Sequence, residues 1–394
     1  MLHRSILTCM ALASALAAQQ SRVEKAWDLI AKGDRTQAIA LLRDEIQSAP
    51  RNGDARLLLG SLLMEEGKAA ESIEQLTEAV SLKPESSEAH NALGEAYNAS
   101  GQPKSARPEF EKAVKIDPRF AQAHVNLAAA LLEDGNATEA APHLNRAISL
   151  LGKTPDAAYP LYLRGKIQLE AREAAKAVPD LELAVKLRPD FAEAWSDLGE
   201  ARRSLFDDAG ALAAFQKAVE LSPEDAVART RCGTKLLDMG KAHEAVPHLQ
   251  AAVRLDPKNQ SALNSLQSAL RKDGQPEEAD VVRRQLTEVI RERDRNDQNL
   301  VKAIDANNRG AELEKSGDVR GAIEKYRVAL ELLPDHVGIR TNLAVALLKT
   351  GKWDEGIAQL REAIRRDPQN KDLQKALEDA LDQAKAHGIK LSNP

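Results

Sequence analysis

The sequence predicts an all-α protein, an α-solenoid in which helix–turn–helix units stack along the chain. Three observations predict it: a fixed period, two apolar stripes in each period, and a glycine between the stripes. Prolines mark the period, and six of the eight steps between them are 34 residues. These prolines are Pro50, Pro84, Pro118, Pro155, Pro189, Pro223, Pro257, Pro334 and Pro368. A fixed period of about this length is typical of stacked-repeat architectures.

The unit from Pro84 to Pro118 shows why each period predicts two helices. Its apolar and small residues recur three and four positions apart, the spacing of one helix face. The first stripe is Ala89, Leu93, Ala96 and Tyr97, and the second is Ala106, Phe110, Ala113 and Val114. Gly101 lies between the stripes, where a residue that tolerates left-handed backbone angles ends the first helix. Because one helix pair cannot bury its own apolar face, we expect each pair to stack on the next.

The same unit carries the spacing L-G-x2-Y-x3-G-x4-A-x3-F-x2-A-x4-P, which resembles the tetratricopeptide repeat. The matching residues are Leu93, Gly94, Tyr97, Gly101, Ala106, Phe110, Ala113 and Pro118. The resemblance extends over roughly residues 18–368, in about ten copies. It implies a right-handed superhelix whose first helices line a concave groove, and a protein that binds another protein there.

The repeats predict a division of the chain into segments. Repeats one to eight occupy residues 18–291, a helical connector 292–300, repeats nine and ten 301–368, and a capping helix with a tail 369–394. The stretch from Glu277 to Arg309 has neither proline nor glycine, which predicts a lengthened helix through the connector. In the tail, one face carries Leu373, Leu377, Ala380, Leu381 and Ala384. A one-sided apolar face is what a capping helix needs.

Repeats five and six depart from the pattern at their turns. Arg172 and Phe206 stand where the other repeats have glycine. A non-glycine residue held at left-handed angles costs on the order of 1 kcal/mol. Sequence drift explains this departure, and a locally soft joint or an altered groove is the alternative.

The N-terminal residues 1–17 predict a signal peptide. Arg4 supplies a positive charge, Ser5 to Leu16 form an apolar run too short to span a bilayer, and Ala15-Leu16-Ala17 is a small-x-small site. We expect cleavage at Ala17 or one residue later, and export to the periplasm or the cell exterior. An apolar first repeat helix and a lipoprotein site at Cys9 are the alternatives.

No motif in the sequence indicates catalysis, a metal or a cofactor. The formal net charge of −5 is mild and evenly mixed, which argues against nucleic acid. His90 and His124 occupy the position of Trp195, so we expect an aromatic packing position. His143 and His248 are equivalent residues three repeats apart, too distant to share an ion. Other residues in the position of Cys232 are Leu93 and Leu127, which predicts a buried hydrophobe and not a nucleophile.

The predicted binding surface is the solvent-facing side of the first helices. Its candidate residues are Glu88, Asn91, Glu95, Asn98, Gln122, Val125, Tyr159, Tyr162, Lys166, Glu193, Ser196, Glu200 and Arg203. This half of the chain leans acidic with apolar patches, so we expect a partner segment with Lys or Arg and an apolar anchor. An ordinary solvated face is the alternative.

Two specialised tetratricopeptide surfaces are not matched by the residues. The set of lysines and asparagines that grips a chaperone C-terminus is not supplied by any three successive repeats. An asparagine ladder is present only at Asn126, Asn308 and Asn342. The resemblance therefore extends to the family and not to a specialised subgroup.

Because the repeats are typical of protein binding and no motif indicates catalysis, we expect a non-catalytic binding scaffold. An accessory subunit of an envelope enzyme that transfers polysaccharide or glycan, and a self-associating structural element, are the alternatives.

Overall fold

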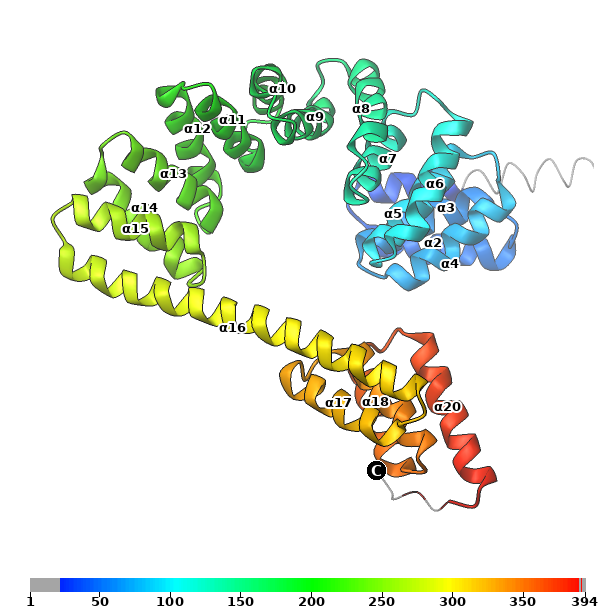
Figure 1. The fold of residues 1–394 in the computed structure, drawn as a ribbon. Coiled ribbons are helices and arrows are strands. Elements are labelled where there is room, and N and C mark those ends of the chain that lie inside the picture. Colours follow the sequence, from blue (N-terminus) through cyan, green and yellow to red (C-terminus); the bar gives the residue numbers. More distant parts are fainter. Residues whose placement is uncertain (1–21, 390, 392–394) are drawn as a thin grey trace, which may run out of the picture. The chain divides into compact units, whose positions relative to one another are not determined.

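A computed structural model describes residues 22–389 and 391, and all regular structure in them is helical (Figure 1). The signal-peptide prediction, residues 1–17 with cleavage at Ala17, lies outside these residues. The chain divides into two compact units, which meet in sequence at Leu255 and Asp256. We call them unit 1 and unit 2 and describe each by itself.

The helices follow the predicted period, and the α-solenoid prediction is confirmed. Unit 1 has a helix over residues 22–31, then α2 (Arg35–Ser48), α3 (Gly53–Glu65), α4 (Ala69–Leu82), α5 (Ser87–Ala99), α6 (Pro103–Ile116), α7 (Ala121–Glu133), α8 (Ala137–Leu151), the 3-10 turn η1 (Pro155–Ala157), α9 (Ala158–Glu170), α10 (Ala174–Leu187), α11 (Ala192–Ser204), α12 (Asp208–Leu221), α13 (Ala226–Asp238) and α14 (Ala242–Leu255). Unit 2 has α15 (Gln260–Lys272), α16 (Pro276–Lys315), α17 (Val319–Leu332), α18 (Val337–Lys349), α19 (Trp353–Arg366) and α20 (Lys371–Ala386). Within each unit the helices pack in consecutive pairs, and each pair packs on the next.

The core of most pairs combines a small residue on the first helix with a large one on the second. Gly94 of α5 lies against the ring of Phe110 of α6, and Gly199 of α11 lies against Phe215 of α12. Both rings are completely buried. Because a glycine has no β-carbon, the helices approach closely enough for the ring to fill the space between them.

The turns of repeats five and six hold non-glycine residues at left-handed angles, as predicted. Arg172 has a φ of 61° and Phe206 a φ of 62°, whereas Gly101, at the equivalent turn of repeat three, has a φ of 70°. The Phe206 side chain is 90% exposed. The strain at this residue is therefore not offset by burial of its ring.

Replacing Phe206 by glycine should raise the free energy of unfolding by about 1 kcal/mol, because glycine adopts these angles without strain. Equilibrium urea unfolding measures the change. Phe206→Ala is the control, since alanine removes the ring and retains the strain. An equal gain in both variants would show that the exposed ring, and not the backbone, is the cause.

In most repeats one position near the start of the first helix donates a hydrogen bond across the junction between repeats, and Leu161 and Leu263 occupy it where the donor is missing. The donor side chain bonds to the carbonyl oxygen of the proline six residues earlier. The donors are Arg56, His90, His124, Trp195, Arg229, Arg340 and Gln374. His90 and His124 are buried, as a packing position predicts, and the hydrogen bond is a further role of the same position. The residues at this position share a side-chain N–H group, which donates to the carbonyl oxygen of the proline that follows the preceding helix. An aromatic ring is not required for this hydrogen bond.

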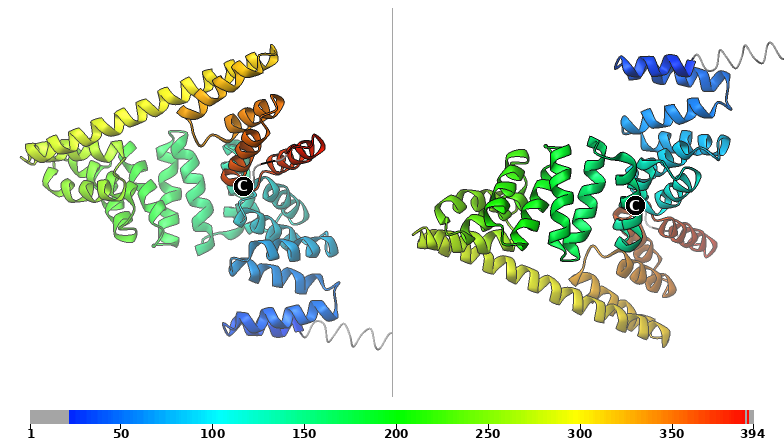
Figure 2. Two further views of the ribbon diagram at one scale, coloured as in Figure 1. Left: turned by 90° about the horizontal axis from the view of Figure 1, so that it is seen from below. Right: turned by 90° about the horizontal axis from the view of Figure 1, so that it is seen from above.

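In unit 2, α16 is a single helix of 40 residues, and both views in Figure 2 show it as one continuous rod. Its first part packs on α15 and its last part on α17, so one helix serves two repeats. This is the stretch for which the sequence predicts a lengthened helix. The final helix α20 buries Leu373, Ala380 and Ala384 against the end of the stack, with Leu377 and Leu381 partly covered.

Candidate functional site

The first helices α5, α7, α9 and α11 of unit 1 carry the predicted binding residues, and α13 is the next first helix in the same row. Seven of these residues are exposed, namely Glu88, Asn98, Gln122, Tyr159, Lys166, Glu193 and Arg203. Glu95, Tyr162 and Glu200 are half-buried. We call the exposed and half-buried face of these helices the α5–α13 surface.

Three predicted residues, Asn91, Val125 and Ser196, are buried, so the expectation that they face solvent is wrong. They occupy equivalent positions in repeats three, four and six, and Thr230 of repeat seven is buried at the same position. The reason is that this position faces the first helix of the next repeat. In repeat five it holds Tyr162, whose larger side chain is only half-buried.

Contacts between successive first helices show how the buried position is used. The amide of Asn126 donates to Asn91 Oδ1 at 2.9 Å and to Glu95 Oε1 at 2.7 Å. In unit 2, Asn342 donates to Asn307 Oδ1 at 3.0 Å across the same interval of 35 residues. Asn126 and Asn342 therefore tie neighbouring repeats together, and their side-chain amides are engaged within the chain.

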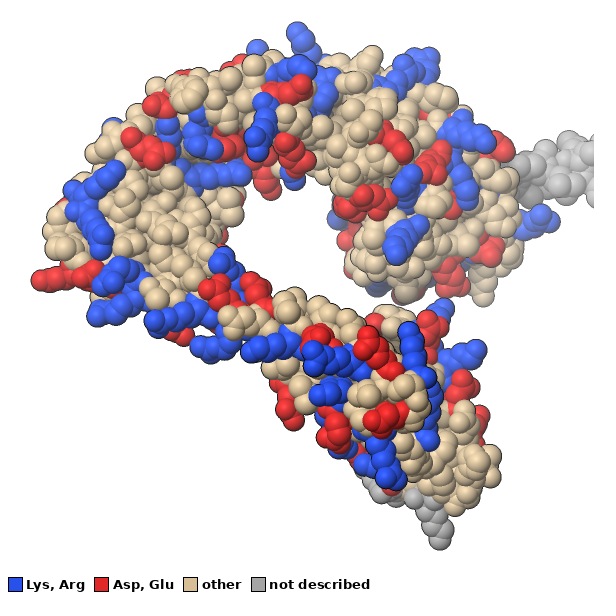
Figure 3. All heavy atoms as spheres, in the orientation of Figure 1, with Lys and Arg blue, Asp and Glu red and all other residues tan. Residues whose placement is uncertain are grey.

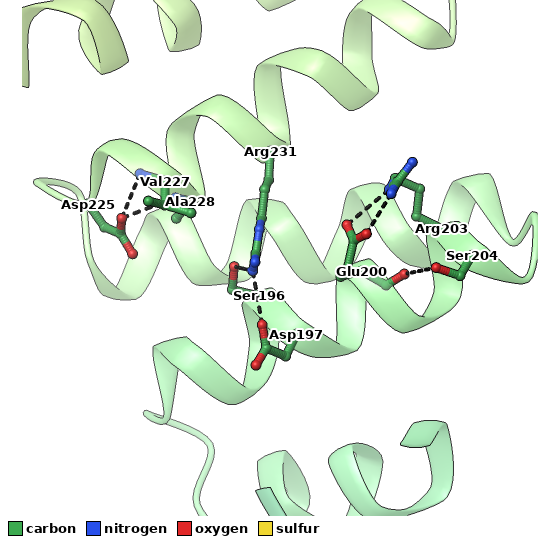
Figure 4. Close-up of polar contacts among 9 residues, drawn as sticks. All are labelled: Ser196, Asp197, Glu200, Arg203, Ser204, Asp225, Val227, Ala228 and Arg231. Atoms are coloured by element: carbon green, nitrogen blue, oxygen red, sulfur yellow. Dashed lines mark hydrogen bonds and ion pairs between the residues drawn. The ribbon is translucent and has the colours of Figure 1, made fainter. Parts of the chain in front are cut away.

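Repeats six and seven use charged groups at this junction (Figure 4). Arg231 of α13 reaches α11, where it donates to Ser196 Oγ at 2.7 Å and to Asp197 Oδ1 at 3.0 Å. Burial raises the pKa of the Asp197 carboxyl, although Arg231 opposes the shift. Farther along α11, Arg203 Nε donates to Glu200 Oε2 at 2.9 Å, and this bond lowers the pKa of Glu200. Both arginines are thus neutralised by carboxylates of the chain itself.

An aromatic cluster lies between α9 and α11. The ring centroids of Tyr162 and Phe191 are 4.8 Å apart, and those of Tyr159 and Tyr162 are 6.3 Å apart. The guanidinium carbon of Arg188 lies 3.5 Å from the centroid of the Phe191 ring, within cation–π distance. Burial, and then the charges of Asp197 and Glu193, raise the pKa of Tyr162 to about 12. Tyr159, which is 40% exposed, presents this cluster to solvent.

A pocket of about 320 Å³ opens beside Tyr159, between α7 and α9. It is lined by Ala129, Leu132, Glu133, Tyr159, Leu163, Lys166, Ile167 and Glu170. It lies near the junction of repeats four and five, where three extra residues precede Pro155 and the turn η1. Among the predicted site residues, the structure brings Tyr159 and Lys166 to this pocket. Sequence reasoning missed Glu133 and Glu170, although each falls at the last position of a first helix.

A pair of histidines joins α7 and α8 at the side of the repeat. His124 Nδ1 and His143 Nδ1 are 2.9 Å apart, and His124 Nε2 lies 3.2 Å from the Pro118 carbonyl oxygen. Because a carbonyl accepts, the hydrogen of neutral His124 is on Nε2, and His143 Nδ1 donates to His124 Nδ1. Burial lowers the pKa of both imidazoles, and His124 lowers that of His143 further. At the equivalent place in repeat three, His90 Nδ1 lies 2.6 Å from Glu109 Oε2.

His143→Glu should reverse the pH dependence of stability at this pair. In the wild type both pKa values are lowered in the folded state, so the stabilisation is complete above the ordinary histidine pKa and is lost as pH falls. A carboxylate at residue 143 should raise the pKa of His124, so the variant gains relative to the wild type as pH falls. Urea unfolding at pH 5.5, 6.5 and 8, chosen to lie around the ordinary histidine pKa of about 6.5, measures the difference.

His143→Gln is the control, because glutamine removes one titrating group without adding charge. It should reduce the acid sensitivity of the wild type without reversing it. A His143→Glu variant whose stability relative to wild type is unchanged between pH 5.5 and 8 would contradict the assignment.

Cys232 is completely buried, and burial raises the pKa of its thiol to about 11. The predicted role as a small buried hydrophobe is confirmed. Across residues 22–389 and 391, no three His, Cys, Asp or Glu side chains lie together as a metal site would require. Within the same residues no helix combines the length and apolarity needed to cross a bilayer.

Comparison with known proteins agrees with this architecture. Two family models described as tetratricopeptide repeat match residues 29–96 and 313–381, and residues 91–158, 162–226 and 233–286. The BBSome complex member bbs-4 of Caenorhabditis elegans is 39% identical over 57 residues, which are 14% of this chain and 12% of that protein. The match therefore spans only a small part of that relative's length.

Two solved structures are similar in fold. PilF of Pseudomonas aeruginosa has a TM-score of 0.50 at 20% identity, covering 54% of this chain and 95% of that one. YrrB, described as a TPR protein with an unusual peptide-binding site, has a TM-score of 0.42 at 20% identity, covering 48% and 96%. The helix pairs, their period and the family matches over most of its length show that this chain belongs to the tetratricopeptide-repeat family.

Proposed function

We propose that the chain is a non-catalytic scaffold whose α5–α13 surface binds a protein segment with basic and apolar residues. The observation that carries this proposal is a surface on which an aromatic residue, Tyr159, and two carboxylates without an ion pair in the described part of the chain, Glu88 and Glu193, are all exposed. Family membership indicates a protein-interaction fold, and it does not identify the partner.

The charges of the surface favour a basic partner. Arg203 and Arg231 are paired with Glu200 and Asp197. By contrast, Glu88 and Glu193 are exposed, and neither makes an ion pair within the described residues. Across both units the visible face mixes acidic and basic side chains without a large basic field (Figure 3), so the selectivity would come from such local groups.

Residues 1–17 support a proposal for location as well. Their positive, apolar and small-residue segments are typical of a secretory signal, so we propose that the chain acts in the periplasm or outside the cell. The partner would then be a protein of the same compartment.

Charge reversal on the surface tests the function. Partners would be captured from envelope fractions with wild-type protein, identified by mass spectrometry, and their affinity then measured for Glu88→Lys plus Glu193→Lys. We expect at least a tenfold loss. The matched control is Glu74→Lys plus Glu78→Lys on the second helix α4, which should bind as wild type does. Equal affinity for all three proteins would overturn the proposal.

A further inference from the structure

We propose that the pocket between α7 and α9 receives the side chain of a lysine or arginine from the bound segment. This inference rests on the proposed function and assigns a particular side-chain class to a particular place. The pocket has an apolar wall and an acidic end. These match the apolar stem and the positively charged head of a long basic side chain.

The apolar wall suits the methylene stem of such a side chain. Leu163 is buried, and Leu132 and Ile167 are half-buried, so their methyl groups line the pocket without closing it. Lysine and arginine bury their stems along apolar surfaces while the charged head remains with polar groups. Tyr159 also lines the pocket, and an aromatic ring attracts a nearby cation.

The acidic end is formed by Glu133 and Glu170. Each is the last residue of its helix, α7 or α9, and neither last turn contains a basic residue. The C-terminus of a helix carries partial negative charge, so two carboxylates placed there favour a nearby cation. Neither makes an ion pair within the described residues, and both are exposed. The chain thus leaves both charges available to a ligand.

Lys166 is a positively charged residue in the lining of the pocket. It does not reverse the preference of the pocket for a positively charged ligand. One ammonium faces two carboxylates, so the lining keeps a net negative charge. Lys166 also acts on Asp197 of α11, where its charge opposes the raised pKa of that carboxyl. A partner carboxylate would meet Glu133 and Glu170, and a purely apolar side chain would desolvate them without compensation.

The test uses full-length protein with labelled leucine and isoleucine methyl groups, observed by NMR. The probes are five blocked tripeptides, Ac-Gly-X-Gly-amide, in which X is arginine, lysine, citrulline, norleucine or glutamate. We expect the arginine and lysine peptides to shift the methyl signals of Leu132, Leu163 and Ile167 saturably. Citrulline, the uncharged analogue of arginine, should bind at least fivefold more weakly.

Variants separate the pocket from general attraction to an acidic protein. Glu133→Gln plus Glu170→Gln should abolish the arginine-dependent shifts, whereas Glu74→Gln plus Glu78→Gln on α4 should retain them. Equal binding of norleucine or citrulline would assign an apolar pocket, binding of the glutamate peptide would assign a Lys166 site, and no shift with any peptide would show no site. Each of these results overturns the inference. If the affinity of the captured partner still falls in the Glu88→Lys plus Glu193→Lys variant, the proposed function stands even though the inference about the pocket fails.

Discussion

Replacing Arg164 by leucine should lower the free energy of unfolding of unit 1 by about 3 kcal/mol. Arg164 Nε and Nη2 donate to the two carboxylate oxygens of Asp180 at 2.7 and 2.6 Å, and Nη1 donates to Asn145 at 2.8 Å. Asp180 is only 8% exposed. Leucine would leave this carboxylate buried without its partner, which costs more than the added apolar contact returns. Equilibrium urea unfolding, with hydrogen exchange of α9 and α10, measures the loss.

The double variant Arg164→Leu plus Asp180→Gln is the control for this prediction. Leu127 occupies the position of Arg164 in repeat four, and Gln75 occupies that of Asp180 in repeat two, so both replacements are residues that the fold already uses. The double variant should recover to within about 1 kcal/mol of wild type, since it removes the uncompensated charge. If the single and double variants lose equal stability, loss of the arginine stem, and not the orphaned carboxylate, is responsible.

The fold was predictable because the same local pattern of residues recurs in about ten repeats along the chain. Gly101 and its equivalents mark the turns. Arg172 and Phe206 could be recognised as exceptions because the other repeats have glycine at the same position. Cys232 could be placed in the core because Leu93 and Leu127 share its position. Such inferences need only the period and the preferences of single residues.

The binding surface was less predictable because it depends on how successive pairs rotate against each other. Asn91 and Ser196 lie on the expected face of a single helix, yet the next first helix covers them. The Arg164–Asp180 pair replaces an apolar contact with a charged one, and neither residue alone signals this. The pocket at Tyr159 lies near the junction where the chain gains three residues, and no local pattern in the sequence predicts a pocket there.

A methyl group at one of the closest helix–helix contacts in the core tests how the repeats stack. Gly94→Ala should destabilise repeat three by about 2 kcal/mol, because overpacking forces neighbouring atoms apart. A β-carbon on Gly94 would lie 2.5 Å from Cε1 and 2.7 Å from Cδ1 of Phe110, far inside van der Waals contact. Amide hydrogen exchange of α5 and α6 measures the local effect, and α13 and α14 in the same molecule serve as the internal reference.

Phe110→Leu should rescue this variant, because repeat four already holds the combination that results. Ala128 and Leu144 occupy the positions of Gly94 and Phe110, and both are completely buried in one cluster. Phe110→Leu alone should also destabilise, since it leaves a cavity opposite the glycine. The two losses should therefore not add, and the double variant should be more stable than either single variant. Additive losses would mean that the two residues do not share one space, and that each repeat sets its helix separation by other contacts.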